Sequence, residues 1–204
     1  MQPSEKMIVV GIDPGIISIG LVCVEVSADY ELVEVLECEA VNITLETHRK
    51  GNHVHDLITA FLKTRERMFD TADVIVIERQ PPMSAGMGLE IMLRERFGSK
   101  CVFISPSTLH VQFNLSGFDY NARKERGVAL VLRHVQVWRD AFVKGADMLE
   151  KKLHCLVRKH DICDAILLLT SWVQRQKKNE QSVRKASSVG FTAFIETFRH
   201  IPSK

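Results

Sequence analysis

Long hydrophobic runs are missing from this sequence. The longest apolar run near the C-terminus, Ala165–Leu169, is far shorter than the roughly 20 apolar residues that a membrane-spanning helix needs. The opening residues, MQPSEK, are polar and lead straight into a short apolar stretch, whereas a secretion signal carries a longer apolar core. We therefore expect a soluble intracellular protein, nuclear or cytoplasmic, that does not act in a membrane.

Paired cysteines are also lacking. The chain holds 5 cysteines, an odd number, and none of them shows CxxC spacing. This favours reduced thiols and argues against a disulfide framework. A mixed group of His and Cys residues between positions 154 and 163 lacks the paired spacing of a zinc site, so we interpret its members as ordinary helix residues.

A strong net charge is absent as well, since the 204 residues sum to only +2. The charge is unevenly spread: residues 173–204 hold seven basic and two acidic residues, or +5, and the remaining 172 hold 20 basic and 23 acidic residues, or −3. A basic end of this kind is suited to binding phosphate. Charge alone equally allows a solvated tail that aids solubility.

What the sequence does contain is an α/β pattern. Apolar or alternating stretches predict strands, which lie at 7–12, 17–26, 31–39, 73–77 and 101–104. Apolar residues at helical spacing predict helices, which lie at 47–69, 84–97, 121–144 and 161–176. This order predicts a mixed five-stranded sheet, with strands 1–3 antiparallel and the later strands parallel, flanked by helices.

The end of the chain differs in character from the rest. After Gln176 the sequence turns polar, and we expect a linker or arm there. We predict a single folded domain over residues 1–178 and a basic C-terminal tail over 179–204. The short apolar piece at 191–198 is a candidate to dock back onto the domain or to contact a partner.

Four carboxylates lie where predicted elements begin or end. Asp13 and Glu78 each follow a buried strand, and Asp161 and Asp164 stand three apart at the start of a helix, which places them on one face. In an open α/β sheet, sites form where strands end and helices begin. Clustered carboxylates repel one another, and a hard divalent cation with a preference for oxygen offsets that repulsion. The pattern therefore predicts a divalent-metal site.

Each of these residues alone also has an ordinary structural interpretation. Asp13 is a common type of turn residue after a strand, and Glu78 is able to pair with Arg79. Asp161 suits the positive end of a helix, with Asp164 as a solvated neighbour. The conjunction of all four is what favours the metal site. His160 is left out of it, because a lone histidine is more often a capping or surface residue.

Three motifs in order resemble those of RuvC-type Holliday junction resolvases. They are GIDPG at 11–15 with SIG at 18–20, IERQ at 77–80, and HDICDA at 160–165. The IERQ form looks most like that of the mitochondrial and poxvirus resolvases. The resemblance covers most of residues 7–176. It implies the RNase H-like fold of the retroviral integrase superfamily, with Asp13, Glu78, Asp161 and Asp164 as catalytic metal ligands.

The stretch at 117–124 resembles the glycine-containing segment of the same family. By that resemblance Lys124 contacts the scissile phosphate, with Arg123 as a fallback, and Arg126 is a further DNA contact. Phe118 and Tyr120 are candidates to stack on exposed bases. Without the motif, the basic residues would simply form a solvated helix face. Family members often carry a further lysine before the glycine, and this chain reads His-Val-Gln at 110–112 instead.

The resemblance implies a DNA endonuclease that cuts four-way junctions by symmetric paired nicks. Each site would use two Mg²⁺ ions, with Mn²⁺ able to substitute. Two symmetric cuts favour a homodimer, whose contacts we expect from the helix at 84–97 or part of 49–69. The IERQ form favours a viral replication site in the cytoplasm or an organelle as the location.

Three other interpretations remain open from the sequence. Asp13, Gly15 and Gly20 also fit the phosphate-binding hairpin of actin-like and sugar-kinase ATPases, although 204 residues leave little room for the second domain that those enzymes need. An RNase H-like nuclease acting on RNA–DNA hybrids, flaps or structured RNA would use the same metal site. A catalytically inactive junction-binding module is disfavoured, because every predicted acidic position is filled.

Overall fold

The computed structural model describes residues 6–15, 18–46, 53–84 and 86–199, with side chains described up to residue 182 apart from residue 46. A five-stranded sheet lies at its centre, in the order β3-β2-β1-β4-β5. Its strands are β1 (Lys6–Asp13), β2 (Ile19–Ser27), β3 (Leu32–Val41), β4 (Val74–Glu78) and β5 (Cys101–Ile104). The first three strands pair antiparallel, and β4 and β5 run parallel to β1, so the predicted mixed sheet is confirmed.

Strand alternation divides the sheet into two buried faces. In β1, Val10 and Ile12 belong to one core, whereas Val9 belongs to the other. In β4, Ile75 and Ile77 lie on the first face and Val76 on the second. Because successive side chains of a strand point to opposite faces, the residues that end β1 and β4 fall on the same face as Val9 and Val76.

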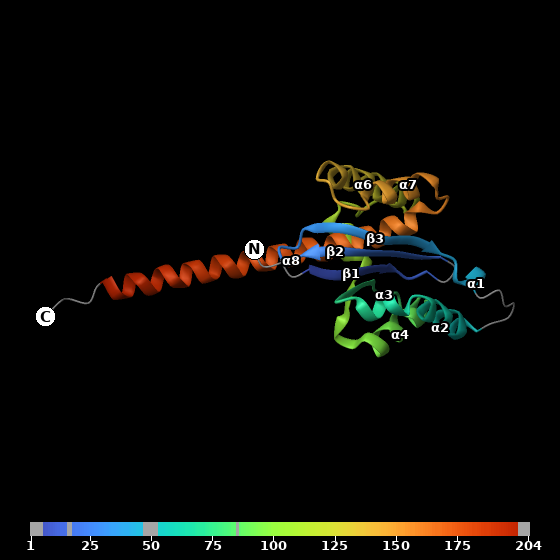
Figure 1. The fold of residues 1–204 in the computed structure, drawn as a ribbon, viewed down its shortest axis with the longest axis horizontal. Coiled ribbons are helices and arrows are strands. Elements are labelled where there is room, and N and C mark those ends of the chain that lie inside the picture. Colours follow the sequence, from blue (N-terminus) through green and yellow to red (C-terminus); the bar gives the residue numbers. More distant parts are fainter. Residues whose placement is uncertain (1–5, 16–17, 47–52, 85, 200–204) are drawn as a thin grey trace.

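Helices cover both faces, which gives three layers (Figure 1). The first face is covered by α2 (Val54–Thr64), α3 (Glu66–Thr71) and α4 (Met87–Phe97), and a short α1 (Ile43–Glu46) follows β3. A 3₁₀ turn at Gly98–Lys100 leads from α4 into β5. The second face is covered by α5 (Pro106–Gln112), α6 (Tyr120–Asp140), α7 (Ala146–Cys155) and α8 (Lys159–Arg199).

Two glycines let α8 approach the sheet closely. A Cβ at Gly20 would lie 1.9 Å from the backbone oxygen of Asp161, and one at Gly11 would lie 2.7 Å from the backbone oxygen of Ala165. No side chain fits at those distances. The glycines of the first sequence motif therefore fix where the start of α8 rests on β1 and β2.

Several predicted helix boundaries were wrong. The predicted helix at 47–69 has its first six residues outside the described part of the chain, and the rest is two helices that break at Arg65. Arg65 leaves helical geometry (φ −117°, ψ 18°), and its guanidinium reaches Glu39 of β3 at 2.6 and 2.9 Å. The predicted helix at 121–144 ends at Asp140, and a left-handed Gly145 (φ 77°) leads into α7.

The helices α5 and α7 were missed, as was the short α1. Directly after β5, Ser105 caps α5 by accepting the Thr108 N–H at 3.3 Å, with Pro106 at the start of the helix. In α7, Leu149 and Leu153 are buried one turn apart, too short a pattern to identify a helix from the sequence.

The polar stretch after residue 176, for which we expected a linker or arm, is helical. The helix α8 continues to Arg199 and extends away from the sheet (Figure 1). The division into a domain at 1–178 and a tail at 179–204 stays a prediction, and the side chains of the apolar piece at 191–198 lie outside the described ones.

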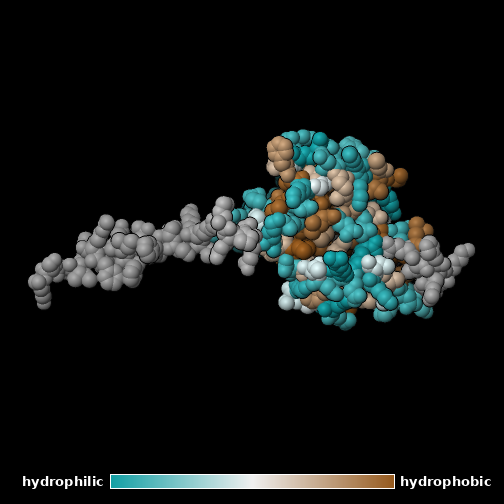
Figure 2. Space-filling view, in the orientation of Figure 1, coloured by the Kyte–Doolittle hydropathy of each residue, from teal (hydrophilic) through white to brown (hydrophobic). Residues whose placement is uncertain are grey.

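The visible surface of the domain is mostly hydrophilic, with apolar side chains gathered in a band between the α6–α7 layer and the sheet (Figure 2). All five cysteines are free, and burial raises the pKa of the Cys23 and Cys163 thiols to about 12. Among the described residues, no helix combines the length and apolar character needed to cross a membrane.

A pair of glycine substitutions tests the close approach of α8. We expect Gly20→Ala to destabilise the protein by about 1–3 kcal/mol or more, because the added methyl group overlaps the backbone of α8. Gly127→Ala is the control: it lies within α6, where an added Cβ would meet its nearest neighbour at 3.5 Å, and it should stabilise by about 0.5–1 kcal/mol. Urea unfolding of both variants measures this, and equal stability of Gly20→Ala and wild type would contradict the proposed packing.

Candidate active site

The site is built on the ends of two neighbouring parallel strands. Ile12 of β1 pairs in register with Ile77 of β4, so the next residues, Asp13 and Glu78, lie side by side. Both point to the sheet face that α8 covers, and the charge of Glu78 acts directly on Asp13.

A third carboxylate comes from α8. Asp164 lies close enough to Asp13 and Glu78 to act electrostatically on both of them. The ammonium of Lys124, on α6, forms an ion pair with Asp164. Three of the four predicted acidic residues and the predicted lysine are therefore brought together, from four different elements of the fold.

Burial and neighbouring charges shift the pKa values of this group. Burial raises the pKa of Asp13 well above its usual range, and the charges of Glu78 and Asp164 raise it further. Burial also raises the pKa values of Glu78 and Asp164, against the opposing effect of Lys124. Burial lowers the pKa of Lys124, but Asp164 and Asp13 outweigh it, so that pKa is raised too. The site favours bound protons or another source of positive charge.

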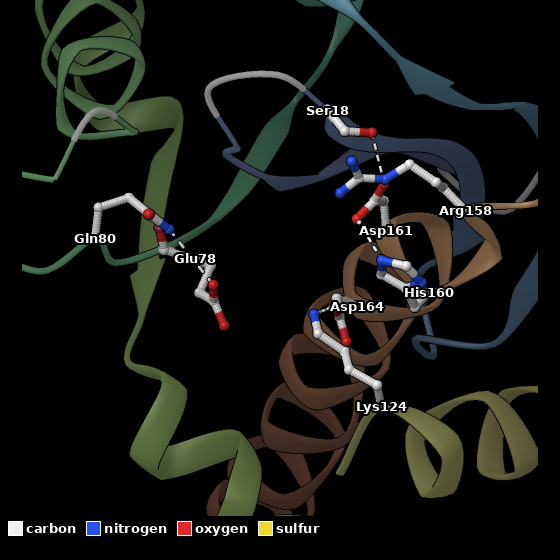
Figure 3. A network of polar contacts seen from close by, with 8 residues as sticks. All are labelled: Ser18, Glu78, Gln80, Lys124, Arg158, His160, Asp161 and Asp164. Carbon is white, nitrogen blue, oxygen red and sulfur yellow. Dashed lines mark hydrogen bonds and ion pairs between the residues drawn. The ribbon is translucent and has the colours of Figure 1, made fainter. Parts of the chain in front are cut away.

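Asp161, the fourth predicted ligand, is engaged differently (Figure 3). Its Oδ2 accepts the Ser18 hydroxyl at 2.5 Å and the Arg158 Nε at 3.1 Å, and its Oδ1 lies 3.3 Å from the Nε2 of His160. It still acts electrostatically on Asp164 one turn along α8. Sequence reasoning missed Arg158, which has no motif of its own. Ser18 lies inside the first motif but was not assigned a role.

The donor set suits a hard divalent cation, because every oxygen ligand is a carboxylate and the group is short of positive charge. Within the described part of the chain, no three His, Cys, Asp or Glu side chains are gathered tightly enough to hold a metal ion. The residues fit the metal in chemical type. Asp13, Glu78 and Asp164 would have to draw closer together, and Asp161 would have to turn, for all four to hold it.

A cleft of about 400 Å³ opens beside the acidic group. Glu78, Asp164 and Lys124 line it together with Arg123 and Tyr120, which is 61% exposed. The lining combines carboxylates, cations and an exposed aromatic ring, and cations with aromatic rings are the residue types that bind phosphates and stack on bases.

Two predicted DNA contacts lie elsewhere. The Arg126 guanidinium stacks on the Phe118 ring, 3.7 Å from its centroid, and neither residue lines the cleft. Arg123 donates to the backbone oxygen of Phe118 at 2.8 Å, which fixes the start of α6 beside the cleft. The predicted DNA-binding residues thus form two groups.

The loop after β4 is held rigidly against the site. The Gln80 N–H donates to Glu90 of α4 at 2.9 Å, and Glu90 is only 8% exposed. The Gln80 side chain in turn donates weakly to the Glu78 carboxylate, at 3.4 Å. Gln80, the last residue of the IERQ motif, therefore orients Glu78, a role that the sequence did not reveal.

Comparison with known proteins agrees with this geometry. The family model described as Poxvirus A22 protein matches residues 7–176, which include all four carboxylates. No curated protein matches the chain significantly in sequence.

The solved structures that resemble the chain share its fold at low identity. A complex of fowlpox virus resolvase with Holliday junction DNA superposes with a TM-score of 0.62 and 16% identity, over 83% of this chain and 99% of that one. The yeast mitochondrial Holliday junction resolvase Ydc2 gives 0.57 and 18%, over 87% and 85%. Thermus thermophilus RuvC with its junction substrate gives 0.51 and 16%, over 85% and 96%. These likenesses show the RNase H-like fold of RuvC-type proteins.

The crowding predicts that Asp13→Asn stabilises the metal-free protein at neutral pH. Because the folded-state pKa of Asp13 is raised above 3.8, its contribution to stability is present at low pH and is lost as pH rises through the raised value. Asparagine does not ionise, so the Asp13→Asn variant does not lose this stability as the pH rises. We expect the variant to melt a few degrees above wild type in EDTA at pH 7, and at about the same temperature as wild type near pH 4.

Asp140→Asn is the matched control for that measurement. Asp140 is exposed and accepts a hydrogen bond from Gln136, which the amide oxygen of asparagine also accepts. It should leave the melting temperature unchanged at both pH values. A lower melting temperature for Asp13→Asn than for wild type at pH 7 would contradict the electrostatic account.

Proposed function

We propose that this chain, which belongs to the Poxvirus A22 protein family, is a structure-selective DNA endonuclease that resolves four-way (Holliday) junctions. The observation that carries the proposal is the buried carboxylate group of Asp13, Glu78 and Asp164, paired with Lys124 beside an open cleft. It lies within the family match and on the fold of proteins whose structures hold Holliday junction DNA.

Divalent metal ions complete the proposed site. Asp13, Glu78, Asp161 and Asp164 would hold two Mg²⁺, for which Mn²⁺ should substitute. When bound, the ions supply an activated water and neutralise the charge that builds on the phosphate during hydrolysis. The raised pKa values of Asp13, Glu78 and Asp164 support this, because burial raises all three and a bound cation would favour the charged carboxylates.

The protein's own residues would position the DNA. Lys124 contributes a positive charge at the scissile phosphate, and Arg123 and Tyr120 line the path along which the strand enters. Phe118 and Arg126 lie outside the cleft and would contact the duplex beside it. The walls of the cleft hold the phosphate still, since hydrolysis at the metals needs one fixed orientation.

A homodimer is the assembly we propose, because two identical sites related by a two-fold axis match the two symmetric cuts that resolve a junction. The helix α4 and part of α2 are the candidate contacts. Cleavage would leave a 5′-phosphate and a 3′-hydroxyl, which a ligase can seal. A viral replication site in the cytoplasm, or an organelle, is the proposed location.

Cleavage of a labelled synthetic four-way junction in Mg²⁺ tests the proposal. Wild type should nick the junction at symmetric positions in two strands, and the products should be ligatable. Asp13→Asn and Glu78→Gln should each reduce the rate by roughly a hundredfold or more, because loss of one metal-bound carboxylate removes transition-state stabilisation. Asp140→Asn serves as the control with unchanged rate.

Linear duplex, a flap and an RNA–DNA hybrid are tested beside the junction. Preferential cleavage of the hybrid or the flap would support the proposed metal site and would contradict the four-way junction as the substrate. Junction binding without any metal-dependent cleavage would indicate a binding module and overturn the enzymatic proposal. ATP hydrolysis by the purified chain would favour the phosphate-binding hairpin of an ATPase.

A further inference from the structure

Asp161 is the one acidic residue of the site whose two oxygens are both held by other side chains of this protein. Ser18 and Arg158 share its Oδ2, and His160 lies against its Oδ1 (Figure 3). The Asp161 side chain is only 7% exposed, whereas that of Arg158 is 55% exposed. The guanidinium therefore lies over a buried carboxylate from the solvent side.

We propose that Arg158 is a phosphate-binding residue of this site, which Asp161 holds back until a divalent metal ion binds Asp161. The inference rests on the proposed function for its substrate, since the phosphate would belong to the junction strand beside the scissile bond. Without metal, the guanidinium neutralises Asp161. With metal, the same carboxylate has a doubly charged partner and Arg158 turns to the DNA.

The charge balance of the site supports this exchange. Two cations form ion pairs with the four carboxylates, each with one of the aspartates of α8: Lys124 with Asp164 and Arg158 with Asp161. A metal ion on Asp161 and a guanidinium on the same carboxylate repel each other. Metal binding therefore weakens the Arg158–Asp161 pair, and a cation beside the reacting strand becomes free for phosphate.

The position of Arg158 makes the release easy. It lies in the turn between α7 and α8, and the adjacent Val157 is 96% exposed. An ion pair whose cation is more than half exposed is screened by water and contributes little to stability. The guanidinium also presents parallel N–H donors in a fork that matches phosphate oxygens, as an ammonium does not.

Metal affinity in the absence of DNA is the first measurement. We expect Arg158→Ala to bind Mn²⁺ severalfold more tightly than wild type in calorimetric titration, because a competing cation has been removed from Asp161. Arg67→Ala, which removes an exposed positive charge from α3, should bind Mn²⁺ like wild type. Weaker binding by Arg158→Ala would mean that Arg158 only positions Asp161, and would overturn the proposal.

Junction binding with and without metal is the second measurement. With Ca²⁺ as the bound ion and cleavage monitored on the same samples, Arg158→Ala should lose about tenfold in junction affinity, and the slope of log K against log salt should fall by about one phosphate contact. In EDTA the loss of junction affinity should be small, because Arg158 is then still paired with Asp161 and does not contact the DNA. Arg158→Lys should keep the salt slope and recover part of the affinity.

An equal loss of affinity in Ca²⁺ and in EDTA would overturn the proposal, because Arg158 would then be a permanent DNA contact. The outcomes are separable from those of the proposed function. If wild type binds no junction, the nuclease proposal fails, and the Mn²⁺ titration still decides whether Arg158 competes with metal. Thermal melting of each variant in EDTA establishes that it is folded.

Discussion

Backbone-to-backbone contact between α8 and the β1–β2 hairpin is the constraint on which the site depends. Gly11 and Gly20 allow it, since side chains at those positions would overlap the backbone of α8 at Ala165 and Asp161. The contact places Asp164 of α8 over the end of β1, next to the strand that carries Glu78. A shift of α8 outward by the width of a methyl group would separate the carboxylates.

The second requirement is a source of positive charge for the buried carboxylates. It explains why the protein keeps a cluster that lowers its stability. Carboxylates that are buried side by side keep their protons more tightly than usual, and two basic residues offset only part of the negative charge. Such an arrangement lowers the stability of the metal-free protein and raises its affinity for a divalent ion and for the phosphate that accompanies it. In the proposed function, the same residues therefore connect metal binding, DNA binding and stability.

Much of this arrangement could be predicted from the sequence, because it depends on local patterns. Apolar runs fixed the five strands, and their ends identified Asp13 and Glu78, since strand alternation puts those two on one face. The helix-start spacing predicted Asp164, and the family resemblance implied Lys124. The turn of Asp161 toward Ser18 and Arg158 could not be predicted. Ser18 lies more than 140 positions away from Asp161 in the sequence, and Arg158 lies in a turn that carries no motif. The helices α5 and α7 were missed since their buried stripes are short, and the continuation of α8 was missed because a polar sequence was interpreted as a linker.

The central claim is that three separate segments of the chain converge on one metal site. Replacing Mg²⁺ by Fe²⁺ and generating hydroxyl radicals with ascorbate and peroxide tests it directly, because a bound iron cuts the peptide bonds nearest to it. The account predicts backbone cuts in one protein near residue 13, near residue 78 and near residues 161–164, all suppressed together by excess Mg²⁺. Cuts confined to one of these segments, or located elsewhere in the chain, would contradict it.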